Sequence, residues 1–263
     1  MRTDHLSRMI GEITESEVLM RTEYREVGHV EALYRYPVKS MRGESIEETH
    51  VGWHGLAGDR RWAFTRTGSD SGLPWVSGRE CPEILGYSAR LTDAGDESSI
   101  EVTSPSGRKY AINDPELCDE IQTVCGRTIS PFHLWRGTFD SMPISLITTD
   151  SIKSIRALPE GAESAERFRP NMLVSATDAK PYVEERWIGE LLVFGEREDA
   201  ARIRVARKDV RCSIVNIDTR TLHNDPAILR EIVAARKNKL GVYGIVERPG
   251  TIRVNDAVRV AMK

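Results

Sequence analysis

The chain has 263 residues, of which 40% are hydrophobic and 29% charged, and its net charge is −3. These values describe a globular protein that can bury a core in one large β domain or two ordinary ones, and they give no indication of a nucleic-acid or membrane surface. No apolar run approaches the roughly 18 residues that span a bilayer. Residues 1–10 contain no apolar signal core, so we expect a cytoplasmic protein.

The cysteines exclude several kinds of metal and redox site. Cys81, Cys118, Cys125 and Cys212 form no Cys-x-x-Cys pair, which argues against a zinc ribbon, a thioredoxin motif and a ferredoxin-type cluster. In a cytoplasm we expect all four thiols to be reduced. Cys118 and Cys125 fall on one predicted helix, where packing is the expected role.

The first half of the chain begins with a peripheral extension and continues as strands. Residues 1–27 alternate charged and apolar residues and predict a helical extension without chemistry. Alternation from Val30 to Tyr36 predicts a strand, which Pro37 ends. Three further strands are predicted at 60–64, 87–91 and 99–103. A helix is predicted at 115–125, capped by Asn113 or Asp114 and ended by Gly126.

The second half shows the same pattern of short elements. Strands are predicted at 144–147, 172–175, 187–194, 202–207 and 241–247, and helices begin near 149–150 and 225–226. Residues 251–254 and 257–260 predict a terminal hairpin around Asn255-Asp256. Many short strands, few helices and no β-α-β order predict a mainly β (α+β) fold, a twisted β-barrel with packed helices.

One thiol lies in a basic stretch. Cys212 follows Arg211, and Arg207 and Lys208 lie just upstream. Nearby cations favour the thiolate, which is the form that binds metals. A buried structural cysteine is the alternative, since free cysteine packs as a small hydrophobe. The local sequence alone favours that alternative, so a role for Cys212 depends on residues elsewhere.

Four patches supply such residues, in the order in which one known family has them. They are Tyr36-Pro-Val-Lys-Ser40, Gly55-Leu-Ala-Gly-Asp-Arg-Arg-Trp62, Phe168-Arg-Pro-Asn171, and Arg211-Cys212 followed by Pro249-Gly-Thr-Ile-Arg-Val254. On these patches the chain resembles the MOSC family, preceded by the MOSC N-terminal β-barrel domain. It looks most similar to the molybdenum-dependent amidoxime-reducing proteins and their bacterial counterparts. The resemblance implies an extension at 1–27, an N-terminal β-barrel domain at 28–127 and a MOSC domain at 128–263.

The resemblance also implies a cofactor and its contacts. The cofactor is molybdenum–molybdopterin, with no pyridoxal phosphate, and the family's metal-ligating and catalytic cysteine falls on Cys212. The implied cofactor contacts are Lys39, Ser40, Arg60, Thr148, Arg169, Asn171 and Arg211. The residue types suit such a group, because a soft metal accepts thiolate and a phosphate needs cations and hydroxyl donors.

The implied activity is reduction of N-hydroxylated small molecules. A separate flavin or iron–sulfur protein would supply the electrons, and neither nucleic acid nor membrane is expected as a partner. The sequence departs from the family beside the thiol, where the common Pro-Cys-x-Arg-Cys is Lys208-Asp-Val-Arg-Cys212 and the common Thr-Thr-Val-Asp is Val215-Asn-Ile-Asp218. A carrier of the cofactor or of persulfide sulfur on Cys212 is therefore the alternative, and a barrel without chemistry is a third.

Several residues have competing interpretations. Arg169 precedes a proline, which would hold it extended, although it could also pair with Glu166 or Asp178. Arg61 alternates with Arg60 and is expected to contact solvent or a partner. Tyr243 and Arg79 are candidates for a substrate mouth.

Two further groups of residues are expected to have no chemistry. Trp53, Trp62 and Trp187 are expected in the core, and His54 and His133 show no metal-ligand spacing.

Overall fold

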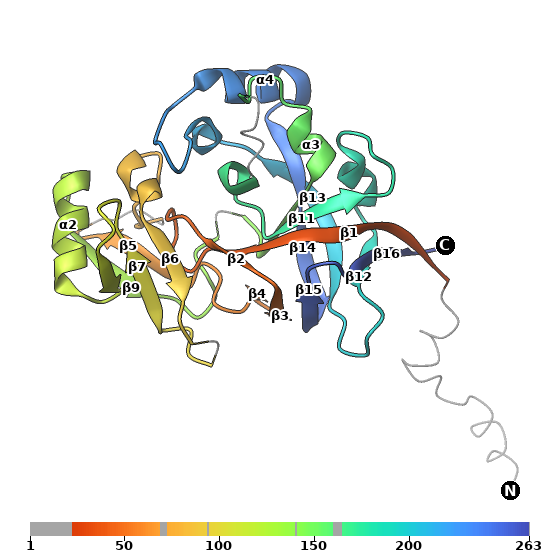
Figure 1. Cartoon of the computed structure of the whole chain (residues 1–263), viewed down its shortest axis with the longest axis horizontal. Coiled ribbons are helices and arrows are strands. Elements are labelled where there is room, and N and C mark those ends of the chain that lie inside the picture. Colours follow the sequence, from red (N-terminus) through yellow and green to blue (C-terminus); the bar gives the residue numbers. More distant parts are fainter. Residues whose placement is uncertain (1–22, 69–72, 94, 140, 160–164, 263) are drawn as a thin grey trace, which may run out of the picture.

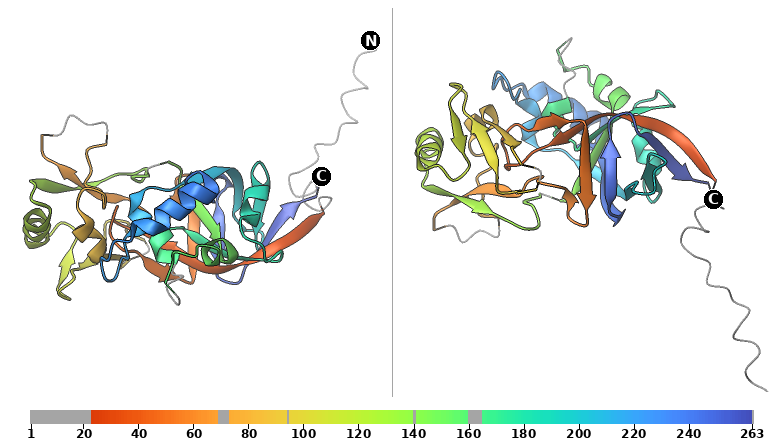
Figure 2. Two further views of the ribbon diagram at one scale, coloured as in Figure 1. Left: turned by 90° about the horizontal axis from the view of Figure 1, so that it is seen from above. Right: turned by 60° about the horizontal axis from the view of Figure 1, so that its bottom comes forward.

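The computed structural model describes residues 23–68, 73–93, 95–139, 141–159 and 165–262 (Figure 1). Two lobes lie side by side in every view, one around a large barrel and one around the helix α2 (Pro115–Cys125) (Figures 1 and 2). The predicted extension at 1–27 falls outside the described residues up to 22. The strand β1 (Tyr24–Arg35) begins within it, so residues 24–27 are strand rather than helix.

The barrel is built from the largest sheet. Its strands in spatial order are β11 (Met172–Ala176), β10 (Ile144–Thr148), β14 (Lys239–Arg248), β13 (Arg202–Val210), β12 (Leu191–Phe194), β16 (Ala257–Ala261), β1 and β2 (Glu44–Ile46). Strand β1 pairs with β16 on one edge and with β11 on the other, which closes seven of these strands into a ring. Only the β10–β11 pair is parallel among these pairings. The mainly β fold class with a barrel is thus confirmed.

Smaller sheets complete the two lobes. Beside the barrel, β15 (Gly250–Arg253) pairs with β3 (Glu48–Gly52), which pairs with β4 (Gly55–Leu56). In the α2 lobe, β5 (Trp62–Arg66) pairs with β9 (Ile129–His133), and β6 (Ser88–Leu91), β7 (Ile100–Thr103) and β8 (Lys109–Ala111) form a meander. The predicted hairpin of 251–254 and 257–260 is wrong, because β15 pairs with β3 while β16 pairs with β1 and β12.

Helices and 3-10 turns cover the sheets. They are α3 (Thr149–Lys153), α4 (Pro226–Arg236), η1 (Pro82–Gly86), η2 (Ala165–Phe168), η3 (Val183–Trp187) and η4 (Ser213–Asn216). Helix α2 begins at the cap Asp114, whose carboxylate accepts from the Glu116 N–H at 2.9 Å, and ends at Gly126 with φ 62°. The strand predicted at 187–194 is shorter than expected, because Trp187 ends the turn η3 and β12 starts only at Leu191.

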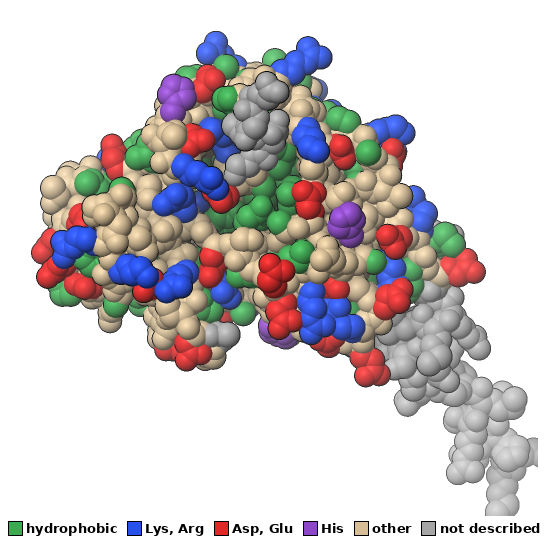
Figure 3. All heavy atoms as spheres, in the orientation of Figure 1, with side chains coloured by type: hydrophobic (Ala, Val, Ile, Leu, Met, Phe, Trp, Pro, Cys, Tyr) green, Lys and Arg blue, Asp and Glu red, His purple; other side chains and the backbone are tan. Residues whose placement is uncertain are grey.

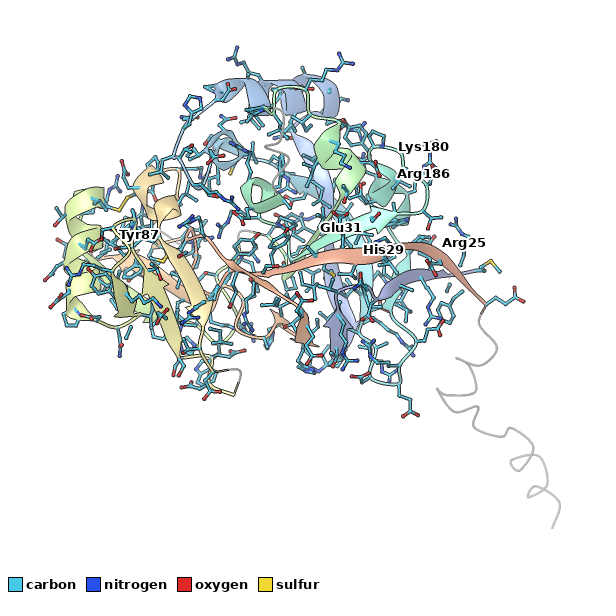
Figure 4. All side chains as sticks on the ribbon, viewed as in Figure 1. Arg25, His29, Glu31, Tyr87, Lys180 and Arg186 are labelled. Carbon is cyan, nitrogen blue, oxygen red and sulfur yellow. A yellow bond between two sulfur atoms is a disulfide. The ribbon has the colours of Figure 1, made fainter. Side chains whose placement is uncertain are left out.

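Three cores hold these layers together. One fills the barrel and includes Val30, Phe194 and Ile252, a second lies in the α2 lobe around Phe64 and Leu117, and a third lies beneath α3 and α4. In the α2 lobe, Tyr87 (Figure 4) ties the end of η1 to α2, because its hydroxyl donates to Glu120 at 2.7 Å. Trp187 and, partly, Trp62 belong to these cores as predicted.

Two sequence-based expectations are wrong. Trp53 is 65% exposed, because it lies in the open β3–β4 turn. Cys81 and Cys125 form a disulfide that ties η1 to α2, so the expectation of four reduced thiols fails for this pair, while Cys118 and Cys212 are free. Elements distant in the sequence brought these two sulfurs together, which spacing could not reveal.

Charged side chains of both signs are mixed over the face shown in Figure 3. No helix among the described residues is long and apolar enough to cross a bilayer.

Candidate cofactor-binding site

A cavity of about 280 Å³ draws its walls from both halves of the chain. The first half contributes Lys39, Ser40, Arg60, Leu73 and Arg79. The second half contributes residues 139, 141, 142, 145, 167–169, 209–212, 214 and 215, with Tyr243. Six lining residues are cationic, namely Lys39, Arg60, Arg79, Arg167, Arg169 and Arg211. Among the lining residues that the structure describes, Asp209 is the one carboxylate. The cavity therefore offers a positive field suited to an anion.

Cys212 lies just beyond the end of the barrel strand β13. Strand β13 stops at Val210, and Cys212 is the residue before the turn η4, with φ −116°. Its thiol is partly exposed and lines the cavity. Within the described ranges, no group of three or more His, Cys, Asp or Glu side chains is placed to hold a metal ion. Among the described lining residues, Cys212 supplies the one thiol that could become a thiolate ligand for a soft metal.

Arg211 braces the segment that carries the thiol. Its Nε donates to the Leu240 carbonyl and its Nη1 to the Phe168 carbonyl, both at 2.7 Å. Its Nη2 lies 2.9 Å from Asp209 Oδ2. Two of its nitrogens are held by protein carbonyls, whereas Nη2 has no hydrogen-bond partner among the described residues, so Arg211 positions Cys212 and adds positive field at the cavity wall.

Asp209 is a buried carboxyl beside the cavity. Only 2% of the residue is exposed, Ser145 Oγ donates to its Oδ2 at 3.1 Å, and the Tyr243 hydroxyl donates to it as well. Burial raises its pKa and outweighs the opposing effect of Arg211. Burial, followed by the Asp209 charge, also raises the pKa of Tyr243. Both groups therefore favour their protonated forms.

Two arginines enclose one buried tyrosine. The guanidinium carbons of Arg60 and Arg169 lie 4.9 and 4.4 Å from the ring centre of Tyr36, which is 1% exposed. Arg60 donates to the Arg169 carbonyl at 3.0 Å and pairs with Asp59, and Arg169 donates to the Met41 carbonyl at 2.7 Å. These contacts fix both cations against the cavity.

The backbone at this wall is strained. Ser40, Arg60 and Arg169 have φ of 67°, 52° and 52°, in the left-handed region that residues other than glycine seldom adopt. The expectation that Arg169 is extended before Pro170 is therefore wrong, because the turn η2 closes on it through bonds from its N–H to Ala165 and Glu166 carbonyls. Such conformations each cost about 1–3 kcal/mol and gather at functional sites.

Lys39 and Ser40 form the adjoining corner. Lys39 Nζ donates to the Thr138 carbonyl at 2.9 Å and lies 5.8 Å from the Trp75 ring centre, although only 6% of the residue is exposed. Ser40 Oγ accepts the Gly78 N–H at 3.1 Å. An accepting oxygen leaves the hydroxyl hydrogen to point toward a ligand.

Two predicted contacts do not reach the cavity. Thr148 is fully buried, and its hydroxyl contacts Glu184 at 2.7 Å and Ser151 at 2.8 Å. Asn171 is also fully buried, with its Oδ1 accepting from the Ser145 N–H at 3.1 Å and its Nδ2 donating to Asp59 at 3.1 Å. Asn171 therefore lies behind Arg60 and Ser145, whereas Thr148 belongs to another cluster.

Arg61 departs from its expected exposure. It is buried, lies 3.1 Å from Glu97 and donates to the Trp135 carbonyl, so it joins segments of the α2 lobe. Both mouth candidates, Tyr243 and Arg79, do line the cavity.

Sequence reasoning gave no role to Asp59, Ser145 and Arg167. A partial signal for Asp209 existed, because it alternates in step with the buried Ile203 and Val205. Register shifts in the β13–β14 pairing leave Arg207, which has the same parity, exposed.

Comparison with known proteins defines the class to which this fold and cavity belong. The MOSC domain matches residues 134–259 and the MOSC N-terminal beta barrel domain matches residues 27–124. The chain belongs to the MOSC family, which is linked to molybdenum-cofactor binding. No curated protein matches the chain.

Solved structures show weaker likenesses. YuaD from Bacillus subtilis is 16% identical with a TM-score of 0.47, covering 92% of this chain and 99% of its own. YiiM from Escherichia coli is 12% identical with a TM-score of 0.42, covering 89% and 70%. YiiM from Geobacillus stearothermophilus is 17% identical with a TM-score of 0.34, covering 46% and 54%. The family assignment depends on the two domain matches, not on these structures.

Proposed function

We propose that this cavity binds the molybdenum–molybdopterin cofactor and that Cys212 is its protein ligand. The observation that carries the proposal is the convergence of one accessible thiol with Lys39, Ser40, Arg60 and Arg169 at a single cavity. The donor set fits the group, because a phosphate takes cations and a hydroxyl while the metal takes one more sulfur. When bound, the cofactor supplies two-electron redox chemistry.

The side chains divide into contacts and supports. Lys39 and Ser40 would hold the phosphate, with Arg60 and Arg169 along the pterin side. Arg211 would add a further cation from the wall beside Cys212, and Asn171 acts from behind, through Asp59 and Ser145, and keeps the wall in place. Cations fixed in advance by protein acceptors bind an anion without first losing side-chain freedom.

The reaction proposed is reduction of an N-hydroxylated small molecule. The N–O bond breaks, two electrons enter from a separate flavin or iron–sulfur protein, and two protons complete the amine-type product and water. Burial raises the pKa of both Asp209 and Tyr243 beside the cavity, which favours a proton at Oδ or Oη where a leaving oxygen would need one. A cytoplasmic setting would provide both the cofactor and the donor.

Cys212→Ser tests the ligand role. Protein made in a host that produces the cofactor is expected to carry molybdenum and pterin, and the variant is expected to lose most of the molybdenum because serine is a poor ligand for a soft metal. Elemental and pterin analysis measure both quantities, with Cys118→Ser as the matched control. Equal molybdenum in wild type and Cys212→Ser would refute the ligand role, and absence of both components from wild type would refute cofactor binding.

The second candidate is a carrier of persulfide sulfur or of the cofactor without turnover. It is favoured by the partly exposed thiol of Cys212 next to Arg211. Mass spectrometry would then find one extra sulfur on Cys212, and reduction of N-hydroxylated substrates with a supplied electron donor would be absent. Turnover without a persulfide would exclude the carrier.

A further inference from the structure

Arg79 differs from the other cations of the cavity. Arg60, Arg167 and Arg211 each pair with a carboxylate, respectively Asp59, Asp218 and Asp209. Lys39 and Arg169 donate to backbone carbonyls. Arg79 is exposed, and it makes no hydrogen bond or ion pair with any residue that the structure describes. Its guanidinium can therefore take an external acceptor.

The turn that carries Arg79 is held firmly. The Gly78 N–H donates to Ser40 Oγ at 3.1 Å, and the Cys81 N–H donates to the Ser77 carbonyl at 3.0 Å. The disulfide to Cys125 follows directly. A side chain on a fixed turn is presented at a fixed place, which is what selectivity between ligands requires.

The neighbouring carboxylate does not compete for Arg79. Glu80 pairs with Arg66 and lies 3.6 Å from Arg127, both outside the cavity lining. Its side chain also accepts from Ser77. The charge of Arg79 is thus not neutralised by the adjacent acid.

Apolar side chains line the cavity together with Arg79. Leu73 and Val210 are 53% and 56% exposed, which is unusual for side chains of this type, and Phe139, Met142 and Ile214 line the same cavity. Exposed apolar side chains gathered at an opening mark a place where an apolar ligand is bound. The mouth therefore combines an apolar wall with a cation, Arg79, that has no partner among the described residues.

We propose that Arg79 is a specificity-determining residue that selects substrates with an apolar body and a carboxylate end. The apolar body lies against Leu73 and Val210, and the carboxylate accepts two hydrogen bonds from the guanidinium, which is the geometry arginine favours. The identity of the reacting group rests on the proposed function, but the preference for a carboxylate depends only on the mouth.

A matched pair of substrates tests the preference in the cofactor-loaded protein. N-hydroxybenzamidine is neutral, and its para-carboxy derivative adds the anion. Arg79→Gln is expected to raise KM for the carboxylate by about tenfold and to leave KM for the neutral compound and both kcat values unchanged. Arg108→Gln is the control, because it removes the same charge from an exposed site outside the cavity lining. An equal change for both substrates would overturn the proposal.

Binding measured without turnover separates this inference from the proposed function. Calorimetry on the protein as purified compares benzoate with benzamide as probes. Wild type and Arg108→Gln are expected to prefer benzoate, and Arg79→Gln is expected to lose that preference. If turnover is absent and the preference follows Arg79, the proposed function fails while the inference stands. If the preference is unchanged in Arg79→Gln, the inference fails whatever the activity.

Discussion

Glu184 is a fully buried carboxyl away from the cavity, in the cluster that holds Thr148. Its Oε2 accepts from Thr148 at 2.7 Å and from Ser151 at 2.8 Å, while Oε1 has no hydrogen-bond partner among the described residues. Burial raises its pKa and outweighs these hydroxyl bonds. The folded protein therefore keeps a proton on Glu184 up to a higher pH than the unfolded chain does.

This proton gives Glu184→Gln a defined effect on stability against pH. Because the folded pKa is the higher one, the Glu184 contribution is most favourable below the ordinary carboxyl pKa and declines as pH rises toward the folded value, by at most about 1.4 kcal/mol per pH unit. Wild type should therefore lose stability relative to Glu184→Gln as pH rises. Urea unfolding at several pH values measures the difference.

Glu247→Gln is a control whose effect on stability is expected to change with pH in the opposite direction. The hydrogen bond from Arg204 lowers the Glu247 pKa, so its contribution is present above the ordinary carboxyl pKa and is lost as pH falls. Parallel pH profiles for wild type and Glu184→Gln would contradict the assignment of a buried proton to Glu184.

The candidate site was largely predictable at the residue scale, with instructive failures. Lys39, Ser40, Arg60, Arg169 and Cys212 stand in short patches whose chemistry suits one anionic ligand, and the fold brings them to one cavity. Thr148 does not line the cavity and Arg61 is buried rather than exposed, because the direction of a side chain depends on its tertiary neighbours. Glu184, the partner of Thr148, lies 36 residues away in the sequence. Glu97, the partner of Arg61, lies in a separate loop.

Helix α2 and the turn η1 are joined by the disulfide Cys81–Cys125, which closes a loop with a sequence separation of 44. A cross-link of this length restricts the unfolded chain and stabilises the fold by about 4 kcal/mol in the chain-entropy model. Loss of the disulfide by Cys81→Ala with Cys125→Ala is expected to lower the free energy of unfolding by that order. Urea unfolding measures it, with Cys118→Ser as the variant that keeps the bond.

Thiol counting checks the bond independently of stability. The native chain should expose two thiols without reductant, those of Cys118 and Cys212, and four after reduction and unfolding. Four thiols before reduction would contradict the disulfide.

The ends of a helix or strand could be predicted where nearby residue types mark them. Asp114 and Gly126 bound α2 through a cap and a left-handed end, both visible as residue types. The pairing between strands was harder to predict from the sequence. Strands β15 and β16 are separated by a short turn, yet they pair with different strands. A turn sequence specifies that the chain bends, but the partner of each strand is set by which sheet edge buries its apolar face.

At the scale of the whole molecule, β1 decides whether the barrel is closed. It belongs to the first half of the sequence, yet it pairs with β16 through residues such as Gly28 and His29 and with β11 through residues such as Val30 and Leu33. Glu31 on the same strand accepts from Thr149 of α3 (Figure 4). The sheet therefore crosses the sequence boundary expected near 128, which composition could not show.

This closure predicts that the barrel does not fold without the first half of the chain. A fragment of residues 134–263 would leave the facing edges of β11 and β16 unpaired and would expose Val174, Val258 and other core residues that β1 covers. Unpaired edges and exposed core favour association of chains. The fragment is expected to lack a cooperative thermal transition and to aggregate, whereas the full chain should unfold in one cooperative transition. Circular dichroism and size-exclusion chromatography measure both, and a monomeric fragment with the midpoint of the full chain would show that β1 is dispensable.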